Sequence, residues 1–268
     1  MIASIPAELR KNSVVLAVDV GNTHTVIGVF RGEEVAESWR VTTHAEATSD
    51  EALMRIGELL ARSEIPARSI THAALSSVVP GLDRVWAKAL SKLLGFAPQI
   101  VSSDNCLGIP LRYDSAKTLG ADRICNVLAL LDMGYDCAVA LDLGTATTLD
   151  ILKDGGFHGG VILPGMTASL HALTTSAAML SPVTLTWTEK VVSTNTADAM
   201  RAGILHGFLG QLDWLMNAIR EELGIDDLPV VATGGWSESL GGKSHYFRNY
   251  RPHLTVEGIR LVALSAKN

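Results

Sequence analysis

The sequence predicts an α/β protein built from a duplicated unit, and two observations lead to that prediction. Apolar segments with strand character alternate with helical segments in both halves of the chain. The stretch AVDVGNTHTVIGVF, residues 17–30, and the stretch ALDLGTATTLDIL, residues 140–152, share one plan. Each is an apolar strand that ends in Asp-x-Gly, followed by a polar Thr-rich turn and a second apolar strand. A motif that recurs in the same context indicates internal duplication.

Composition limits the class of protein. The chain has 268 residues, of which 47% are hydrophobic and 19% charged, as expected for a globular protein with a proper core. The net charge of −6 gives no basic surface for nucleic acid or for an anionic membrane, so we expect neither as a partner. Cys106, Cys125 and Cys137 show no C-x-x-C spacing, and the opening MIASIPAELRKN has no apolar signal-peptide core. We therefore expect a cytoplasmic protein.

The first half contains the signals of a sheet with helices. Strands are expected at VVLAVDV, TVIGVF, EVAESWRV, ITHAALSSVVP and QIVSS. Thr48 and Glu51 form a capping box that opens a helix, whose apolar stripe is Leu53, Ile56 and Leu60. A second helix is expected over residues 82–94, after the Pro-Gly stop of the preceding strand.

The second half repeats the alternation. A helix is expected from about Asp122, with Ile124, Val127, Leu128 and Leu131 on one side. The hairpin at Asp142 then restarts the pattern and continues through the segment FHGGVILPG. Two helices are expected next, over about residues 166–180 and 196–223. The strand PVVATGG and a final amphipathic segment, LTVEGIRLVALSA, complete the second half. We place the domain boundary near residues 112–120, with an N-terminal domain of residues 1–115 and a C-terminal domain of residues 116–268.

Residues 155–188 contain no Asp, Glu, Lys or Arg. Gly, Pro, Ser and Thr interrupt this stretch, so it has no unbroken apolar run long enough for a membrane helix. Met166, Leu170, Leu173, Ala177 and Leu180 fall at helical spacing within it. A helix with so little charge is usually buried, so we expect it either in a core or at an interface between subunits.

The repeated turn suits phosphate binding. Glycine lets the backbone approach a ligand closely, and successive N–H groups can point at an anion. Asp19 and Asp142 would repel a polyphosphate unless a cation lay between them, so each implies a metal ion or its water shell. A single such turn is more often an ordinary hairpin, but the second copy favours a pair of phosphate clamps. No P-loop and no G-x-G-x-x-G after a strand competes for this role.

These hairpins, together with ATGG at residues 232–235, resemble the three nucleotide-binding elements of the acetate kinase, sugar kinase, heat-shock chaperone and actin superfamily. The resemblance implies two duplicated actin-like (ribonuclease H-like) domains with the nucleotide in the cleft between them. One hairpin would belong to each domain.

Within that superfamily the chain is similar to type III pantothenate kinases. The motifs occur in the family's order: DVGNTHTVIGVF, SSVVP, LGADR, DLGTATT, GGVILPGM, NTADAMRAGI and ATGG. The resemblance implies transfer of the γ-phosphoryl group of ATP to the primary hydroxyl of pantothenate, which is the first step of coenzyme A synthesis. It also implies Mg²⁺ with ATP, a monovalent cation (K⁺ or NH₄⁺) and a homodimer that shares its substrate site across the interface.

The resemblance also implies a set of site residues. The proton acceptor would be Asp122, although an Asp at a helix start can also simply cap the helix. ATP would contact Asp19, Val20, Gly21, Asn22, Thr23, His24, Thr25, Val26 and Thr145. Pantothenate would contact Tyr113, Gly120, Ala121, Asp122, Arg123 and, from the neighbouring subunit, Thr196. Asp142 would bind the monovalent cation, and Asp19 would order the water shell of Mg²⁺.

Three positions depart from the family pattern: His24 in the first hairpin, Ser193-Thr194 before Asn195, and Trp236 after ATGG. Alternative readings keep the fold and change the function. They are a kinase of another small alcohol, an accessory or regulatory protein, and an ATPase of the actin or chaperone type without a small acceptor.

Overall fold

The computed structural model describes residues 5–265. It divides into two compact units, each described here by itself. Unit 1 comprises Met1–Ala140, Asp150–Gly159 and His253–Asn268, and unit 2 comprises Leu141–Leu149 and Gly160–Pro252. This division differs from the boundary at residues 115/116 expected from the sequence, which stays a prediction.

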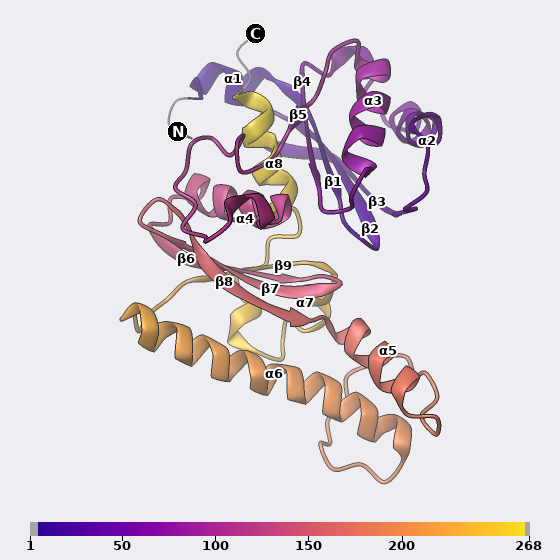
Figure 1. The fold of residues 1–268 in the computed structure, drawn as a ribbon, viewed down its shortest axis with the longest axis vertical. Coiled ribbons are helices and arrows are strands. Elements are labelled where there is room, and N and C mark those ends of the chain that lie inside the picture. Colours follow the sequence, from indigo (N-terminus) through magenta and orange to yellow (C-terminus); the bar gives the residue numbers. More distant parts are fainter. Residues whose placement is uncertain (1–4, 266–268) are drawn as a thin grey trace. The chain divides into compact units, whose positions relative to one another are not determined.

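Unit 1 contains a five-stranded sheet in the order β3-β2-β1-β4-β5 (Figure 1). Its strands are β1 (Val14–Val20), β2 (His24–Arg31), β3 (Glu34–Thr42), β4 (His72–Ser77) and β5 (Gln99–Ile100). Its helices are α1 (Ala7–Asn12), α2 (Ser49–Arg62), α3 (Leu82–Leu94), α4 (Ala121–Asp132) and α8 (Leu254–Leu264), with short 3₁₀ turns at Ala67–Ser69 and Ala116–Thr118. Strands β1 to β3 form antiparallel hairpins, while β4 runs parallel to β1 and β5 parallel to β4.

The sheet of unit 1 is covered on both faces. Alternate residues of β1, namely Leu16, Val18 and Val20, pack with α2 and α3 in one buried cluster. Helix α8 packs against β1 and β4, and α4 packs against α8 and β4 (Figure 1). Because side chains alternate along a strand, the other alternating set, Val15, Ala17 and Asp19, belongs to the opposite face. Asp19 therefore lies near the end of β1 on the face that carries α8 and α4.

The second sheet has the order β8-β7-β6-β9. Its strands are β6 (Cys137–Leu143), β7 (Ala146–Lys153), β8 (Gly156–Pro164) and β9 (Val230–Thr233). Residues 137–140 of β6 and residues 150–159, from β7 and β8, belong to unit 1. The helices of unit 2 are α5 (Met166–Ser176), α6 (Thr196–Leu223) and α7 (Gly235–Ser239), with a 3₁₀ turn at His245–Phe247.

The two sheets confirm the duplication expected from the repeated motif. In the first, β1 lies between its hairpin partner β2 and the later strand β4, with β3 outside β2. In the second, β6 lies in the same way between β7 and β9, with β8 outside β7. The two Asp-x-Gly turns therefore join topologically equivalent strands.

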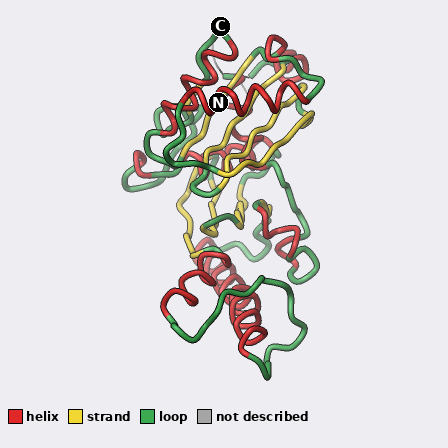
Figure 2. The backbone as a smooth tube through the Cα atoms, turned by 90° about the vertical axis from the view of Figure 1, so that its right-hand side faces the viewer, coloured by secondary structure: helices red, strands yellow, loops and turns green. Residues whose placement is uncertain are grey.

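The uncharged helix is shorter than expected. Helix α5 ends at Ser176, and residues 177–195 form an irregular segment before α6 (Figure 2). The expectation that Ala177 and Leu180 continue the helix is wrong: Ala177 is extended, with φ −119° and ψ 99°. The side chain of Thr174 bonds back to the carbonyls of Leu170 and His171, a competition with backbone bonding that weakens helices.

Helix α5 was expected either in a core or at an interface between subunits, and its burial argues against the core. Of its residues only Met166 is buried, and Leu173 is 38% exposed. The helix therefore does not belong to the core of this chain, and the interface remains as its predicted environment. No helix among residues 5–265 combines the length and the apolar character that a membrane crossing requires.

Candidate active site

The first phosphate hairpin is closed by a tight turn between β1 and β2. The N–H of Gly21 donates to the carbonyl of His24 at 3.1 Å, and Val20 pairs with Thr25 across the strands. Asn22 and Thr23 form the exposed tip. The hairpin therefore presents polar side chains and backbone at its tip, as an anion site requires.

Side chains just after the tip are already bonded within unit 1. Thr25 is buried, and its hydroxyl lies 2.9 Å from that of Thr43. Nη2 of Arg40 lies 3.0 Å from Nδ1 of His24, and the pKa of His24 is lowered by partial burial and by the charge of Arg40. The departure from the family pattern at position 24 therefore places there an imidazole that favours its neutral form more than an ordinary histidine does.

The second hairpin turns between β6 and β7 in unit 2. The N–H of Gly144 donates to the carbonyl of Ala146 at 3.1 Å, which leaves Thr145 exposed at the tip. Gly165 donates its N–H to the carbonyl of Thr145, and a Cβ atom on Gly165 would lie 2.4 Å from that oxygen. The GGVILPGM motif thus needs glycine at 165 because its backbone supports the second hairpin.

The ATGG motif packs on the start of the same hairpin. Gly234 has φ +87°, a conformation that favours glycine, and a Cβ atom there would lie 2.6 Å from Oδ1 of Asp142. Asp142 and Gly234 are therefore neighbours within unit 2. Trp236, a departure from the family pattern, donates from Nε1 to the hydroxyl of Thr167 at 3.3 Å.

Asp122 occupies the first turn of α4, which begins at Ala121. The N-cap residue, Gly120, has no side chain to cap the helix, and Oδ1 of Asp122 accepts the N–H of Arg123 at 2.8 Å. Burial raises the pKa of Asp122, while the Arg123 N–H and the Arg123 charge oppose the shift. A carboxylate with a raised pKa is a stronger base than an ordinary Asp, which suits Asp122 to accept a proton.

Asp19 and Asp122 both act on the thiol of Cys125 in unit 1. This thiol is fully buried one helical turn after Asp122. Burial, followed by the charges of Asp19 and Asp122, raises the pKa of Cys125 well above the usual value. The first-hairpin carboxylate and the predicted proton acceptor therefore both lie near enough to Cys125 to influence it.

Arg123 is held more firmly than the sequence suggested. Its Nε donates to Oδ1 of Asp150 at 2.5 Å, and its guanidinium lies 5.2 Å from the centre of the Phe157 ring. The edge of the Tyr113 ring meets the same Phe157 ring, with centroids 5.8 Å apart. Sequence reasoning missed Asp150 and Phe157. The only signal was a single Asp in the otherwise apolar strand segment LDIL.

Thr196 is the first residue of α6 and is exposed. Asn195 caps the helix: its side-chain oxygen accepts the N–H of Asp198 at 2.9 Å, and its amide donates to the Asp198 carboxylate. The Ser-Thr-Asn-Thr loop therefore keeps a complete N-terminal cap despite its departure from the family pattern. Thr196 belongs to unit 2, whereas Tyr113, Gly120, Asp122 and Arg123 belong to unit 1.

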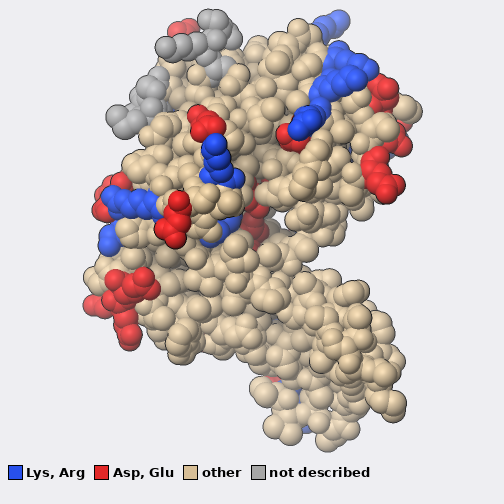
Figure 3. All heavy atoms as spheres, in the orientation of Figure 1, with Lys and Arg blue, Asp and Glu red and all other residues tan. Residues whose placement is uncertain are grey.

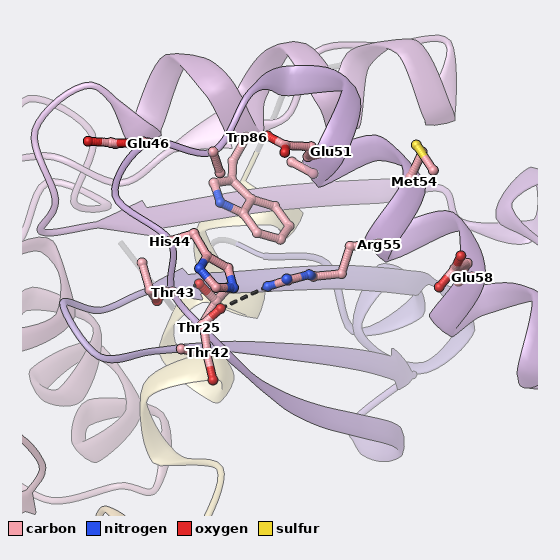
Figure 4. A pocket seen from close by; sticks show the side chains of 12 residues that line it. Thr25, Thr42, Thr43, His44, Glu46, Glu51, Met54, Arg55, Glu58 and Trp86 are labelled. Carbon is pink, nitrogen blue, oxygen red and sulfur yellow. Dashed lines mark hydrogen bonds between the residues drawn. The ribbon is translucent and has the colours of Figure 1, made fainter.

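A cavity of about 540 Å³ in unit 1 lies beside the first hairpin and touches it only at Thr25 (Figure 4). Several of its polar groups are bonded within unit 1. Arg55 donates to the carbonyl of Thr42 at 2.8 Å, Thr25 pairs with Thr43, and Glu51 accepts from Thr48 in the capping box. We do not place the reaction there, because these bonds leave little to recognise a phosphate.

Metal ligands do not gather in the described part of the chain. Among residues 5–265, no three or more His, Cys, Asp and Glu side chains form a group that could hold a metal ion.

Comparisons with known proteins agree on one family. A model of type III pantothenate kinase matches residues 15–218. The chain is 36% identical to the type III pantothenate kinase of Desulfosudis oleivorans over 256 residues, covering 95% of this chain and all of that protein. It is 39% identical to that of Frankia alni over 251 residues, covering 93% of this chain and 98% of that protein.

Solved structures of lower identity share the fold. A putative Baf family transcriptional activator from Campylobacter jejuni aligns with TM-score 0.56 at 18% identity, over 92% of this chain and 96% of that one. An activator of 2-hydroxyisocaproyl-CoA dehydratase from Clostridium difficile, with bound ADPNP, aligns with TM-score 0.54 at 11% identity, over 95% and 98%. The α/β fold of the actin-like ATPase class is thereby confirmed. With a family model matched over most of its length, and relatives above one-third identity along nearly all of it, the chain belongs to the type III pantothenate kinase family.

Proposed function

We propose that the protein transfers the γ-phosphoryl group of ATP to the primary hydroxyl of pantothenate, giving 4′-phosphopantothenate. The observation that carries the proposal is Asp122, a carboxylate at the start of α4 whose burial raises its pKa, in a chain of this family. Phosphoryl transfer needs positioning, neutralisation of charge and an acceptor for the hydroxyl proton. Asp122 supplies the last of these.

In this proposal Asp122 accepts a hydrogen bond from the pantothenate hydroxyl and takes its proton as the bond to phosphorus forms. A raised pKa makes the carboxylate a stronger base than an ordinary Asp. Arg123, Tyr113, Gly120 and Ala121 would bind the rest of pantothenate. Both Tyr113 and Arg123 rest on Phe157, which supports a common substrate surface for them.

The two hairpins would hold the phosphates of ATP through residues 19–26 and Thr145. Asp19 is the next-to-last residue of β1 and would order the water shell of Mg²⁺, which supplies charge neutralisation on the β- and γ-phosphates when bound. Asp142 is the next-to-last residue of β6, beside a glycine that leaves no room for a Cβ atom, and would bind K⁺ or NH₄⁺. These single carboxylates suit cations that take most of their ligands from phosphate and water.

We further propose a homodimer in which Thr196 reaches the pantothenate site of the neighbouring subunit. Exposed apolar side chains support it: Met179 is 93% exposed, Val192 86% and Trp214 70%, all on the segment after α5 or on α6. The region of α5 is almost without charged side chains on the face shown in Figure 3. Apolar surface of this extent is typical of an interface. The cysteines Cys106, Cys125 and Cys137 form no disulfide, which supports a reducing, cytoplasmic setting.

The decisive experiment measures ADP release with and without pantothenate. We expect release that depends on pantothenate and a product one phosphoryl group heavier than pantothenate by mass spectrometry. Asp122→Asn should lower turnover by about 10²–10⁴-fold while leaving ATP binding nearly unchanged. ADP release without an acceptor would instead favour an ATPase, and a variant with more than half the normal turnover would refute the role of Asp122.

A further inference from the structure

The carboxylate of Asp150 is fully buried in the middle of β7, beyond the Thr-rich turn of its own hairpin. Its oxygens accept from Nε of Arg123 at 2.5 Å and from Nδ2 of Asn126 at 3.1 Å. All three residues lie in unit 1. A buried carboxylate is costly unless it is paired, so this one requires an explanation.

The pairing leaves part of Arg123 unused. Asp150 takes the Nε edge of the guanidinium, and Phe157 lies under its face. Arg123 is only 5% exposed, yet Nη2 is buried and has no hydrogen-bond partner among residues 5–265. Buried donors in native structures are nearly always bonded, so an unused guanidinium N–H indicates a missing partner. That partner must accept hydrogen bonds, and the guanidinium fork matches both carboxylate and phosphate oxygens. Because Arg123 shares the Phe157 ring with Tyr113, another predicted pantothenate contact, we take the carboxylate of the acceptor as the partner.

Hydrogen bonds from neighbouring helices hold the Asp150 carboxylate in place. Asn126, on α4, is fully buried, and its side-chain oxygen accepts from the hydroxyl of Thr255, on α8, at 2.9 Å. One chain of hydrogen bonds thus links α8, α4 and β7 and ends at Arg123. A guanidinium held at Nε and stacked on an aromatic ring loses little freedom when it binds a ligand, because its orientation is already set.

A second buried arginine of unit 1 uses its guanidinium the other way round. Arg260 donates to the carbonyl of Gly32 at 3.1 Å and contacts Asp132 at 3.5 Å through its two terminal nitrogens, and its buried donor without a partner among residues 5–265 is Nε. In Arg123 the ion pair uses Nε instead, and the buried donor without a partner is the terminal Nη2. A terminal nitrogen is the one that can reach a ligand beyond the end of the side chain.

We propose that Asp150 is a positioning residue: it holds Arg123 through Nε so that the terminal N–H groups bind the carboxylate of the acceptor, and it thereby selects acceptors that carry a carboxylate. This inference rests on the proposed function, since it takes pantothenate as the acceptor. Asp150 itself touches neither substrate nor the reacting atoms. Its loss therefore affects the binding of one chemical group and leaves phosphate binding unchanged.

The test compares pantothenate with pantothenol, which keeps the acceptor hydroxyl and replaces the carboxylate with a neutral alcohol. In Asp150→Asn we expect KM for pantothenate to rise by about 10- to 100-fold, as for loss of an aligned charged hydrogen bond. KM for ATP and KM for pantothenol should both stay unchanged. If pantothenol is not phosphorylated but only inhibits, its inhibition constant takes the place of its KM. The control is Asp132→Asn, which breaks the ion pairs with Arg10 and Arg260 in the same unit and should leave both acceptors unaffected.

A measurement on the unaltered protein covers the case in which Asp150→Asn does not fold. Burial raises the pKa of Asp150 to about 6 against the opposing effects of Arg123 and Asn126, and Asp122 is the other charged group that acts on it. As the pH falls through about 6, Asp150 takes up a proton, so KM for pantothenate should rise while that for pantothenol should not. Protonation of Asp122 would affect both acceptors alike.

The outcomes separate the inference from the proposed function. If the unaltered protein does not phosphorylate pantothenate, the proposed function fails before any variant is compared. If it does, but pantothenate and pantothenol respond equally to Asp150→Asn or to pH, Asp150 is a structural residue only and the inference is wrong. A rise confined to pantothenate in either experiment supports it.

Discussion

A Cβ atom on Gly120 would lie 2.4 Å from Oδ1 of Asp122, closer than real Cβ contacts allow. The same position would approach Cγ1 of Val78, in the SSVVP motif, at 3.6 Å. Glycine at the N-cap of α4 is thus the condition for the observed place of the carboxylate, which bonds to the N–H of Arg123. The GADR motif therefore combines a small residue and an acid for a steric reason.

Gly120→Ala should displace the Asp122 carboxylate and lower kcat by at least about tenfold, since small misplacements of a catalytic group are costly. Steady-state kinetics would measure this, with thermal unfolding to show that the variant is folded. Gly57→Ala, at a helical glycine with nothing within 4 Å of the added atom, is the matched control and should keep full activity. An active Gly120→Ala variant would mean that the carboxylate has another working position.

The pH dependence of kcat should report Asp122. Only the ionised carboxylate accepts a proton, and burial raises its pKa above the usual 3.8. Turnover at saturating pantothenate should therefore fall as the pH falls through that raised pKa, so the acid limb lies at higher pH than for an ordinary Asp. Direct quantification of the phosphorylated product avoids coupling enzymes that fail in acid. A kcat that stays flat down to about pH 4 would contradict the assignment.

Activity should require K⁺ or NH₄⁺ through Asp142. A carboxylate that faces a polyphosphate needs a cation between them, so Asp142→Asn should weaken the response to K⁺ and lower turnover. ADP release would be titrated with K⁺ at constant ionic strength maintained with a larger monovalent cation. Full activity of the unaltered protein without K⁺ and NH₄⁺ would show that Asp142 has a different task.

A shared site predicts complementation between two inactive variants. Asp122→Asn lacks the base, and Thr196→Tyr should block the pocket, so each homodimer should be nearly inactive. In a mixed dimer with sites built from both chains, one site carries both changes and the other carries neither. Random pairing should then restore about a quarter of normal activity.

The control for that experiment is the same pair of variants mixed after folding, without exchange of subunits. No recovery on co-expression would mean that Asp122 and Thr196 serve a site within one chain. Sedimentation of the unaltered protein as a monomer would also contradict the shared site.

Gly258 of α8 should be indispensable for stability. A Cβ atom there would lie 2.0 Å from the carbonyl oxygen of Cys125 on α4, and backbone cannot move aside as a side chain can. Gly258→Ala should lower the free energy of unfolding by about 3 kcal/mol or more, at the upper end of overpacking effects. Gly57→Ala should instead raise it by about 0.5–1 kcal/mol, as expected for glycine replaced in an open helical position. Denaturant unfolding would measure the free energy of unfolding of both variants. Equal changes in the two would contradict the close packing of Gly258 on Cys125.

Local signals predicted much of the fold. Helices α3 and α6 have the expected bounds, because Gly81 and Gly95 flank the first and Asn195 and Gly224 flank the second. The capping box of Thr48 and Glu51 forms as expected. The end of α5 was missed because side-chain bonding by Thr174 competes with a favourable apolar spacing. The strand expected at QIVSS is reduced to Gln99–Ile100 at the sheet edge, where it has β4 as its neighbour in the sheet.

The candidate site, too, could be predicted from the sequence only in part. The turn glycines, Asp122 and its neighbours were visible as motifs, because each acts within a few residues of its position in the chain. Asp150 was not, since its role depends on Arg123, 27 residues away, and on Asn126 and Thr255. Only the tertiary structure shows which buried charged residues form an ion pair. From the sequence alone, Asp150 is therefore an unexplained Asp in an apolar strand.

The packing of α8 has a consequence for how the chain is made. Helix α8, Leu254–Leu264, completes the layer against β1 and β4, which lie near the other end of the sequence. While the ribosome is still adding residues, the face of β1 that carries Asp19 lacks this cover. Unit 1 therefore cannot finish folding as an early domain on the ribosome, and the nascent chain carries an open apolar sheet through most of its synthesis. Because β1 and α8 lie far apart in the sequence, a fragment that stops before α8 leaves this face of β1 uncovered, and contacts between distant parts of the chain limit the speed of folding.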